Sequence, residues 1–264
     1  MIVDEVGTWA KEKHERLRKY VVASSGARRK FLPPVGEGAS YIDLYCGSGR
    51  AIIRDTNETI DGSPLVAFKC ARDTNSRFSE IHLADADPDK RSAAIRRIEE
   101  LGGKAIEHAG AADRAVKTVC DYLNPYGLHF AFLDPYNLQD LPFSVIASLA
   151  RFQRMDMLIH VSAQDLQRNL HLYTAEGDTR LETFMPGWRR AVNVNQSQQR
   201  VRAALLQYWL EKIKKLGLSP AGGIELVSGE KNQRLYWLVF VSRSEFAKGL
   251  WEDIRNVSGQ SQLL

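Results

Sequence analysis

A short polar sequence after an apolar segment carries residue types that could hold a reacting group. The segment His129 to Asp134 is a predicted buried strand, and a proline, a tyrosine and an asparagine follow it directly. A carboxylate and nearby backbone carbonyls can bind an amine, a proline keeps a turn rigid, and a tyrosine ring can stack on a base. The alternative is a turn in which the acid caps the next helix. The predicted catalytic residues are Asp134, Pro135, Tyr136 and Asn137.

An earlier apolar segment, Ser40 to Cys46, ends in a sequence that contains two glycines. A doubly wound sheet binds its ligand at the carboxyl ends of its strands, and glycines there let the backbone pass close to that ligand. The charge of Asp43 suits the ammonium and sulfonium of S-adenosylmethionine (SAM) and would repel a pyrophosphate. A purely structural carboxylate is the alternative. The predicted cofactor-binding residues in this segment are Asp43, Tyr45, Gly47, Ser48 and Gly49.

Two further strand ends extend the predicted cofactor site. Ile81 to Asp85 is a predicted strand, and an acid at its tip can accept two hydrogen bonds from a ribose diol. We therefore add Asp85 and Ala86, although a surface turn is the alternative and NAD carries the same diol. After the third strand, Ala111 leaves room for an adenine. Asp113 either reaches the exocyclic amine of that adenine or caps the following helix.

Residues after the fifth predicted strand, Met155 to Val161, would line the same cleft. They combine an acid, a base and two amides, which suits hydrogen bonding to a polar acceptor molecule. The predicted substrate-binding residues are Gln164, Asp165, Arg168 and Asn169.

The order of the elements predicts the fold class. Strands and helices alternate from Ser40 to Val161, which is typical of an α/β fold with a Rossmann-like, doubly wound and mostly parallel sheet. A long helix follows from Gln198 to Leu216. Two strands, Gly223 to Val227 and Leu235 to Val241, then form a predicted antiparallel hairpin through the turn-rich Ser228 to Asn232. Five strand–helix units, a long helix and a hairpin are the element order expected of a SAM methyltransferase.

The start of the chain and one long loop complete the predicted organisation. We divide the chain into an N-terminal helical extension, residues 1–38, and a methyltransferase-like α/β domain, residues 39–264. The extension contains a predicted surface helix from Val6 to Val22. Between Arg50 and Gly62, a long loop precedes a helix with Ser63 as its predicted N-cap. This loop would either cover the cofactor as a lid or enlarge the substrate cleft.

Composition narrows the class of protein. The 264 residues are 44% hydrophobic and 26% charged, as in ordinary globular proteins. The sequence contains no apolar run of about 18 residues, so it predicts no membrane span. The N-terminus lacks a signal-peptide pattern, and we therefore expect a cytoplasmic protein. The three cysteines are widely spaced, which argues against disulfides and a zinc site, and we expect no metal.

Basic residues gather in two segments on either side of a near-neutral centre. Lys11 to Lys30 holds eight basic residues and two acids, and Asp178 to Pro220 holds eight basic residues and three acids. Two basic flanks are consistent with a footprint for nucleic acid. Solvated helix faces are the equal alternative, because the net charge is only +4.

Several motifs in order resemble the three-Cys-motif partner proteins, a bacterial and phage family with a methyltransferase-like fold. The resemblance covers nearly the whole chain and implies a radical-SAM-like partner protein, whose cysteines give the family its name. Many members have Ala-Gly-Pro-Gly where this chain has Cys46 to Gly49, so the glycines match. The matching segments are Gly7 to His14, Gly47 to Arg50, Gly62 to Leu65, Phe132 to Tyr136, Asp165 to Asn169 and Tyr236 to Phe240.

Three functions follow from these patterns. The favoured hypothesis is methyl transfer from SAM to a nucleic acid, since amino methyltransferases of nucleic acids have a similar Asp-Pro-Pro-aromatic sequence; here Tyr136 replaces the second proline. A second is a non-catalytic nucleic-acid-binding or partner subunit that keeps the fold. A third, an NAD-dependent oxidoreductase, is disfavoured because the third glycine of G-x-G-x-x-G is missing.

Overall fold

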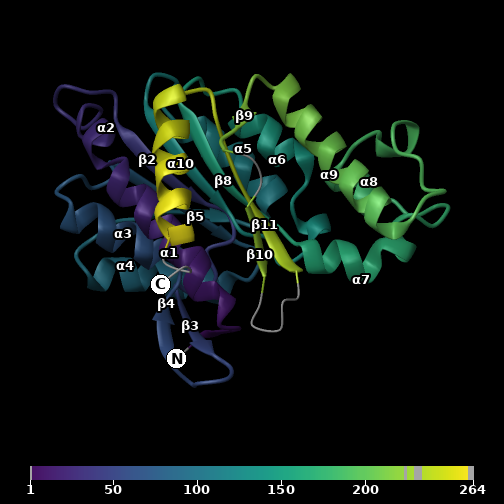
Figure 1. The fold of residues 1–264 in the computed structure, drawn as a ribbon. Helices are drawn as coiled ribbons and strands as arrows, with labels where there is room; N and C mark the ends of the chain where they lie inside the picture. The colour runs from purple at the N-terminus through teal and green to yellow at the C-terminus, as the bar shows by residue number, and fades with distance from the viewer. Residues whose placement is uncertain (1, 223–224, 229–233, 261–264) are drawn as a thin grey trace.

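A twisted central sheet organises the molecule in this computed structural model, which describes residues 2–222, 225–228 and 234–260. The sheet has eight strands, and β9 (Ser219–Pro220) pairs only with the end of β11. The other seven lie in the order β10 (Glu225–Ser228), β11 (Arg234–Ser242), β8 (Met155–Val161), β7 (Leu128–Leu133), β2 (Ala39–Asp43), β5 (Glu80–Asp85) and β6 (Ile106–Ala109) (Figure 1).

Strand direction separates the two ends of this sheet. The five strands from β6 to β8 are parallel, whereas β11 runs antiparallel to both β8 and β10. The chain builds outward from β2 to β6 and then returns to the opposite side of β2 with β7. This reversal leaves a crevice at the carboxyl ends of β2 and β7, which is where sheets of this kind bind ligands.

Helices cover both faces of the sheet, because every residue of β2 and β8 is buried and each face needs an apolar partner. One face packs against α1 (Trp9–Ala23), α3 (Ser63–Asp73), α4 (Pro88–Glu100) and α10 (Glu245–Gln260) (Figure 1). The other packs against α5 (Ala112–Tyr122), α6 (Phe143–Leu149), α7 (Ala163–Tyr173), α8 (Arg180–Phe184) and α9 (Gln198–Lys215). The shorter helical segments are α2 (Ser25–Arg29), η1 (Leu138–Asp140) and η2 (Trp188–Arg190).

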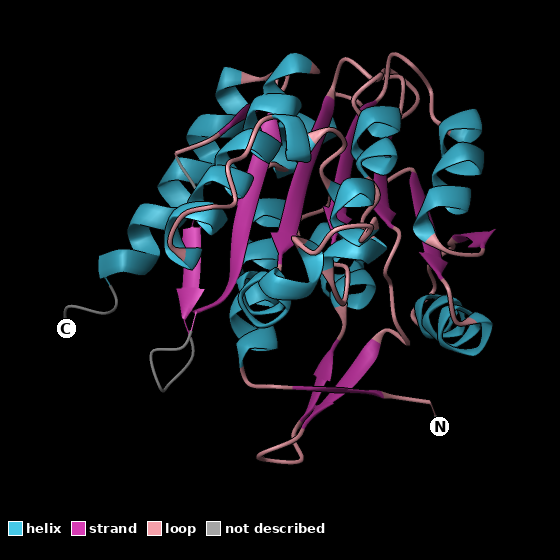
Figure 2. Ribbon diagram, turned by 90° about the vertical axis from the view of Figure 1, so that its right-hand side faces the viewer, coloured by secondary structure: helices cyan, strands magenta, loops and turns pink. Residues whose placement is uncertain are grey.

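A second, smaller sheet stands where a loop was predicted. Its strands are β1 (Asp4–Val6), β3 (Arg50–Ile53) and β4 (Thr59–Asp61), with β1 parallel and β4 antiparallel to β3. The predicted loop from Arg50 to Gly62 is therefore a hairpin with an N-terminal strand laid along it (Figure 2). Strands of three or four residues show too little alternation to be recognised from sequence.

Other local predictions had mixed outcomes. The helix predicted from Val6 begins at Trp9, because the preceding residues are used in β1. Ser63 is not the N-cap of α3: Gly62 occupies that position, and the Ser63 hydroxyl bonds the Asp43 carboxylate instead. The final strands are antiparallel, but their predicted connection lies largely outside the described residues. No helix among the described residues is long and apolar enough to cross a membrane.

Candidate cofactor and acceptor site

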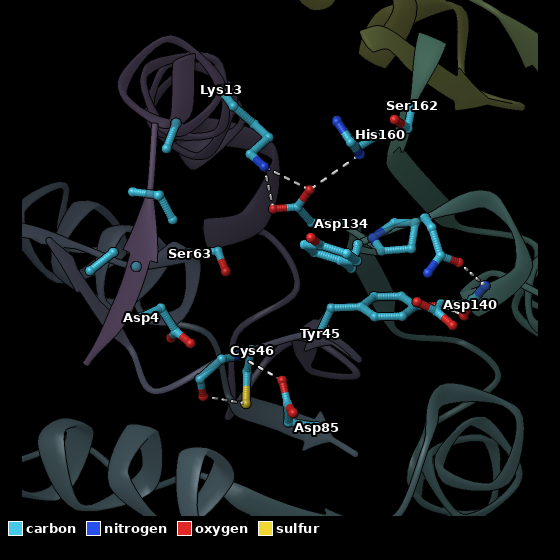
Figure 3. A pocket seen from close by; sticks show the side chains of 18 of the residues that line it. Asp4, Lys13, Tyr45, Cys46, Ser63, Asp85, Asp134, Asp140, His160 and Ser162 are labelled. Carbon is cyan, nitrogen blue, oxygen red and sulfur yellow. Dashed lines mark hydrogen bonds and ion pairs between the residues drawn. The ribbon is translucent and has the colours of Figure 1, made fainter. Parts of the chain in front are cut away.

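A cavity of about 1320 Å³ lies at the carboxyl ends of the parallel strands. Its walls come from the residues that follow β2, β5, β7 and β8, together with β1, the start of α1 and the β3–β4 hairpin. Figure 3 shows the side chains of Asp4, Lys13, Tyr45, Asp85 and Asp134 around this space. The predicted residues that line it are Tyr45, Gly47, Gly49, Asp85, Ala86, Ala111, Asp134, Pro135, Tyr136, Asn137, Gln164, Asp165, Arg168 and Asn169.

The glycine loop after β2 forms one wall of the cavity. Gly47 and Gly49 have φ angles of +54° and +79°, a left-handed conformation that favours glycine. A Cβ atom on Gly47 would lie 2.6 Å from the Asp4 Oδ2 atom. The backbone conformation therefore favours glycine at this position, and a larger residue would also displace the Asp4 carboxylate.

Asp85 stands at the tip of β5 and holds the same loop. Its Oδ2 accepts a hydrogen bond from the Gly47 backbone N–H at 3.0 Å, and its Oδ1 accepts one from the Asp87 N–H at 2.9 Å. Each carboxylate oxygen retains a further lone pair for a ligand in the cavity. Asp113, the acid suggested for the exocyclic amine of an adenine, lines the cavity together with Ala111.

Two residues predicted to bind the cofactor lie elsewhere. Asp43 is completely buried and does not line the cavity; it accepts hydrogen bonds from the Tyr41 hydroxyl, the Tyr45 backbone N–H and the Ser63 hydroxyl. Burial raises its pKa to about 7. Ser48 is also buried, and its hydroxyl donates to the Arg50 carbonyl at 2.7 Å. Both residues support the loop from beneath, because their polar atoms are engaged within the protein.

An N-terminal acid takes a position at the glycine loop that sequence reasoning did not anticipate. The Asp4 Oδ2 atom accepts a hydrogen bond from the Ser48 backbone N–H at 2.7 Å, and its Oδ1 atom lies 2.8 Å from the Lys90 Nζ atom. Arg97 adds hydrogen bonds to the backbone carbonyls of Ser48 and Ile2. Strand β1 is thus fastened to the loop by side chains from α4.

On the opposite side of the cavity, Asp134 follows β7 and meets a lysine from α1. The Lys13 Nζ atom lies 2.7 Å from Asp134 Oδ1 and 2.6 Å from Oδ2 (Figure 3). His160, on β8, places its Nδ1 atom 3.4 Å from Asp134 Oδ1. Burial would raise the pKa of Asp134, but nearby positive charge, chiefly that of the Lys13 ammonium, leaves the pKa below its ordinary value.

The two buried histidines beside Asp134 are poor bases. Burial is the main cause that lowers the pKa of His160 to about 4, and the nearby Lys13 charge lowers it further. The same two causes lower the pKa of His14, next to Lys13 on α1, to about 4. Both imidazoles are therefore uncharged near neutral pH.

Of the remaining catalytic candidates, Pro135 is buried, Asn137 is half-buried and Tyr136 lies at the exposed rim of this side. The Tyr136 side chain is 92% exposed. Asn137 is the N-cap of η1, and its Oδ1 accepts a hydrogen bond from the Asp140 N–H at 3.1 Å. The Tyr45 hydroxyl donates a hydrogen bond to the Asp140 carbonyl at 2.7 Å and so links the segment after β2 to the segment after β7. A flat molecule could lie on the Tyr136 ring without displacing protein atoms.

The predicted substrate residues lie on α7, at the far end of the same side. Asp165 accepts hydrogen bonds from the Leu138 N–H at 2.9 Å, the Tyr173 hydroxyl at 2.8 Å and the Asn169 amide at 2.7 Å. It therefore joins α7 to the segment after β7. Gln164 and Arg168 also line the cavity. The sequence did not predict α7 itself, although the acid three residues after Ser162 matches the observed N-cap.

The strand order decides the fold class. In class I methyltransferases, the sheet is parallel except for one antiparallel strand, which lies second from an edge. Here that strand is β11, which lies between β8 and β10. This chain has the class I methyltransferase fold. No protein-family model and no curated protein matches the sequence, so the resemblance to three-Cys-motif partner proteins stays a prediction.

Several solved structures are similar to this chain at low sequence identity. Protein LPL1258 from Legionella pneumophila has a TM-score of 0.54 and 11% identity, over 93% of this chain and 91% of that chain. A putative RNA methyltransferase, PH1948 from Pyrococcus horikoshii, gives 0.44 and 11%, over 92% of each chain. SMU.1697c, a putative methyltransferase from Streptococcus mutans in complex with SAH, gives 0.40 and 9%, over 88% of this chain and 96% of that chain.

Residues that sequence reasoning missed come mostly from the N-terminal segment. Asp4 and Lys13 reach the cavity from before the first strand of the methyltransferase fold, and their partners are far away in the sequence. Local spacing cannot reveal such pairs. The one signal was the Gly7 to His14 segment, which contains Lys13 and belongs to the motifs behind the family resemblance.

The first basic flank is largely used in contacts within the protein, and the second is used in part. In the first, Lys11 pairs with Glu58 at 2.6 Å, and the buried Arg28 bonds the carbonyls of Ser76 and Val21. In the second, Arg180 pairs with Asp178 at 2.5 Å, and Arg189 donates to several backbone carbonyls. These contacts weaken the argument that the whole flanks form a nucleic-acid footprint.

Proposed function

We propose that this protein is a SAM-dependent methyltransferase whose acceptor is a base in a nucleic acid. One observation carries the proposal. A glycine loop with an acid at the neighbouring strand tip and an acid–proline–tyrosine sequence stand on opposite sides of one cavity. In this fold, that edge of the sheet is where a ligand binds.

The cofactor side fits SAM in its residues and in its space. Gly47 and Gly49 would let the backbone approach the amino-acid part of the cofactor, and Asp85 would accept hydrogen bonds from the ribose hydroxyls. Ala111 and Asp113 would flank the adenine. When bound, SAM supplies a methyl group activated by its sulfonium. The cavity of about 1320 Å³ exceeds the range of about 300–1,000 Å³ typical of single-ligand pockets, so an acceptor group fits beside the cofactor.

On the acceptor side, alignment is the main task of the protein. Asp134 and the backbone next to Pro135 would bind an amine by hydrogen bonds, and the exposed Tyr136 ring would stack on the base that carries it. Holding a nucleophile in line with the methyl group replaces much of the entropy cost of a bimolecular reaction. The surrounding walls would exclude water from the reaction.

Transfer of a radiolabelled methyl group from SAM tests this function directly. Total bacterial RNA and sheared bacterial DNA are incubated with the wild type, with Asp134→Asn, and with Asp121→Asn, an exposed acid on α5 that does not line the cavity. We expect label in nucleic acid with the wild type and the α5 variant, and almost none with Asp134→Asn.

The outcomes separate the alternatives. Tight SAM binding without transfer to RNA or DNA would contradict the proposal and favour a non-catalytic subunit, such as the partner of a radical-SAM-like protein. Label in protein or in a small molecule would contradict only the nucleic-acid acceptor.

A further inference from the structure

The Lys13–Asp134 pair joins two parts of the chain that are 121 residues apart. Lys13 extends from α1 across the wall of the cavity and contacts both carboxylate oxygens, at 2.6 and 2.7 Å (Figure 3). Both side chains are largely shielded from solvent, with exposures of 10% and 17%. A two-point contact of this kind fixes the rotation of a carboxylate, and in a shielded place it is strong enough to persist.

Other groups around Asp134 do not replace Lys13. His14 lies beside it on α1, and His160 faces Asp134 from β8, but both imidazoles are uncharged near neutral pH because their pKa values are about 4. Asp43, from β2, adds a carboxyl group whose own pKa is raised to about 7 by burial. Lys13 is thus the cation that balances the Asp134 carboxylate among the described residues around it.

This balance limits the chemistry open to Asp134. Burial favours the protonated acid, but nearby positive charge, chiefly that of the Lys13 ammonium, reverses that preference, so the pKa of the Asp134 carboxyl group lies below its ordinary value. A carboxylate with a low pKa is a weak general base near neutral pH, so this arrangement favours an acceptor that needs no prior deprotonation. The same carboxylate still accepts hydrogen bonds through the lone pairs that Lys13 leaves open.

We infer that Lys13 is a positioning residue, which holds Asp134 as a fixed hydrogen-bond acceptor. We also infer that the atom that receives the methyl group is a neutral nitrogen of a nucleic-acid base. The inference rests on the proposed function and deepens it. A neutral nitrogen already has a nucleophilic lone pair, so no prior deprotonation is needed. With SAM bound, this nitrogen would form its bond to the methyl carbon as the carbon–sulfur bond breaks, sulfur would keep the electron pair, and the methylated nitrogen would lose its extra proton to bulk solvent after the transfer.

Four variants test the role of Lys13. Lys13→Met removes the charge, Lys13→Arg keeps it, and Lys13→Met combined with Asp134→Asn removes both charges, so that no buried charge is left unpaired. Lys11→Met is the matched control, because Lys11 lies on the same helix but pairs with the exposed Glu58 outside the cavity. The double variant shows whether any loss of folding in Lys13→Met comes from the unpaired carboxylate.

The first measurement does not depend on any acceptor. The protein is labelled with ¹³C at aspartate carboxyl carbons, and the Asp134 signal is identified by its absence in Asp134→Asn. We expect the pKa of Asp134 to rise in Lys13→Met and to stay unchanged in Lys11→Met. An unchanged titration in Lys13→Met would overturn the role of Lys13, whether or not the protein is a methyltransferase.

The second measurement follows methyl transfer to total bacterial RNA and DNA. We expect Lys13→Met to lose roughly tenfold to hundredfold in kcat, the range for a misplaced reacting group. The SAM Kd should stay the same, and the acidic limb of the rate profile should move to higher pH. Lys13→Arg should recover most of the rate. Loss of SAM binding instead of kcat would overturn the positioning role.

The product identifies the acceptor atom. Digestion to nucleosides followed by mass spectrometry should place the methyl group on a base nitrogen. A methyl group on a ribose oxygen or a base carbon would overturn the acceptor class while leaving the proposed methyltransferase function intact. A wild type that transfers no methyl group would contradict the proposed function, and the carboxyl titration would still decide the role of Lys13.

Discussion

The two sides of the cavity are built in different ways. The cofactor side consists mainly of backbone groups and small residues that follow strand ends, such as Gly47, Gly49 and Ala111. The acceptor side depends on long side chains that meet from distant parts of the chain, with Lys13 from α1 against Asp134 after β7. The residues of a site made from strand ends can be recognised in short segments of sequence. Side-chain pairs from distant segments are brought together only by the tertiary structure.

This difference predicts that variants on each side damage different steps. Changes at the cofactor side should weaken SAM binding, and changes at the acceptor side should slow transfer while SAM still binds.

Asp134→Ala should reduce methyl transfer the most. It removes the fixed hydrogen-bond acceptor and leaves Lys13 without its partner in a shielded place. We expect a loss of about a hundredfold to a thousandfold in single-turnover rate, as when one preorganised polar group is deleted from an active site. The SAM Kd, measured by calorimetry on the same preparation, should change little. If rate and SAM affinity fell together, the two sides would not be separable.

Asp85→Ala should weaken SAM binding roughly tenfold to hundredfold, because hydrogen bonds to a charged group contribute about 1.5–3 kcal/mol. The change also frees the Gly47 N–H, which Asp85 now holds at 3.0 Å. Asp89→Ala, in the first turn of α4, is the control, since Asp89 does not line the cavity. Equal SAM affinity in the two variants would show that Asp85 does not bind SAM.

Tyr136→Ala should weaken nucleic-acid binding about fivefold to a hundredfold, since stacking of a base on an aromatic ring is worth about 1–3 kcal/mol. Tyr126→Ala is a suitable control, because Tyr126 is also exposed but does not line the cavity. Filter binding at low salt compares the two variants. The same loss in both would indicate general surface binding in place of stacking at the site.

Asp43→Asn should have the smallest effect on the ligands, with SAM affinity kept within about twofold, because Asp43 does not line the cavity. Its effect on stability should depend on pH. Burial raises the pKa of Asp43 from 3.8 to about 7, so the unfolded chain releases this proton first. The wild type therefore loses stability from this group as the pH rises through that window, and the loss is complete above it.

Denaturant unfolding at several pH values checks this sign. The unfolding free energy of Asp43→Asn should rise relative to the wild type between pH 4 and pH 7 and then level off. A difference that shrinks over this window would mean that Asp43 is ionised and favourably paired in the folded protein. A large loss of SAM affinity in the variant would restore Asp43 to direct cofactor contact.

The predicted and observed structures differ where the fold depends on contacts between distant segments of the chain, which local sequence patterns do not reveal. The five parallel strands could be predicted because short segments rich in apolar residues alternate with helical segments along the chain, and β2, β5 and β7 end at or just before an acid. The β1–β3–β4 sheet could not, because β1 pairs with residues more than forty positions away and its strands are short. Ser63 was assigned to a helix cap because no local pattern reveals that its hydroxyl bonds Asp43.

The candidate site shows the same division at the level of single residues. Asp85 and Asp134 were found because an acid at a strand tip is a local signal, and both line the cavity. Asp4, Lys13 and His160 were not, because their importance depends on what they meet across the cavity. Their part in function stays a proposal until the variants are measured.

Calorimetric titration of the wild-type protein with SAM, and separately with NAD, tests the central claim most directly. The glycine loop, Asp85 and the small residues near the adenine position should give saturable, enthalpically measurable SAM binding with a Kd in the micromolar range, corresponding to about −8 kcal/mol. NAD should give no saturable heat, because its pyrophosphate would meet the Asp4 carboxylate at the glycine loop. Saturable binding of NAD without binding of SAM would contradict the account.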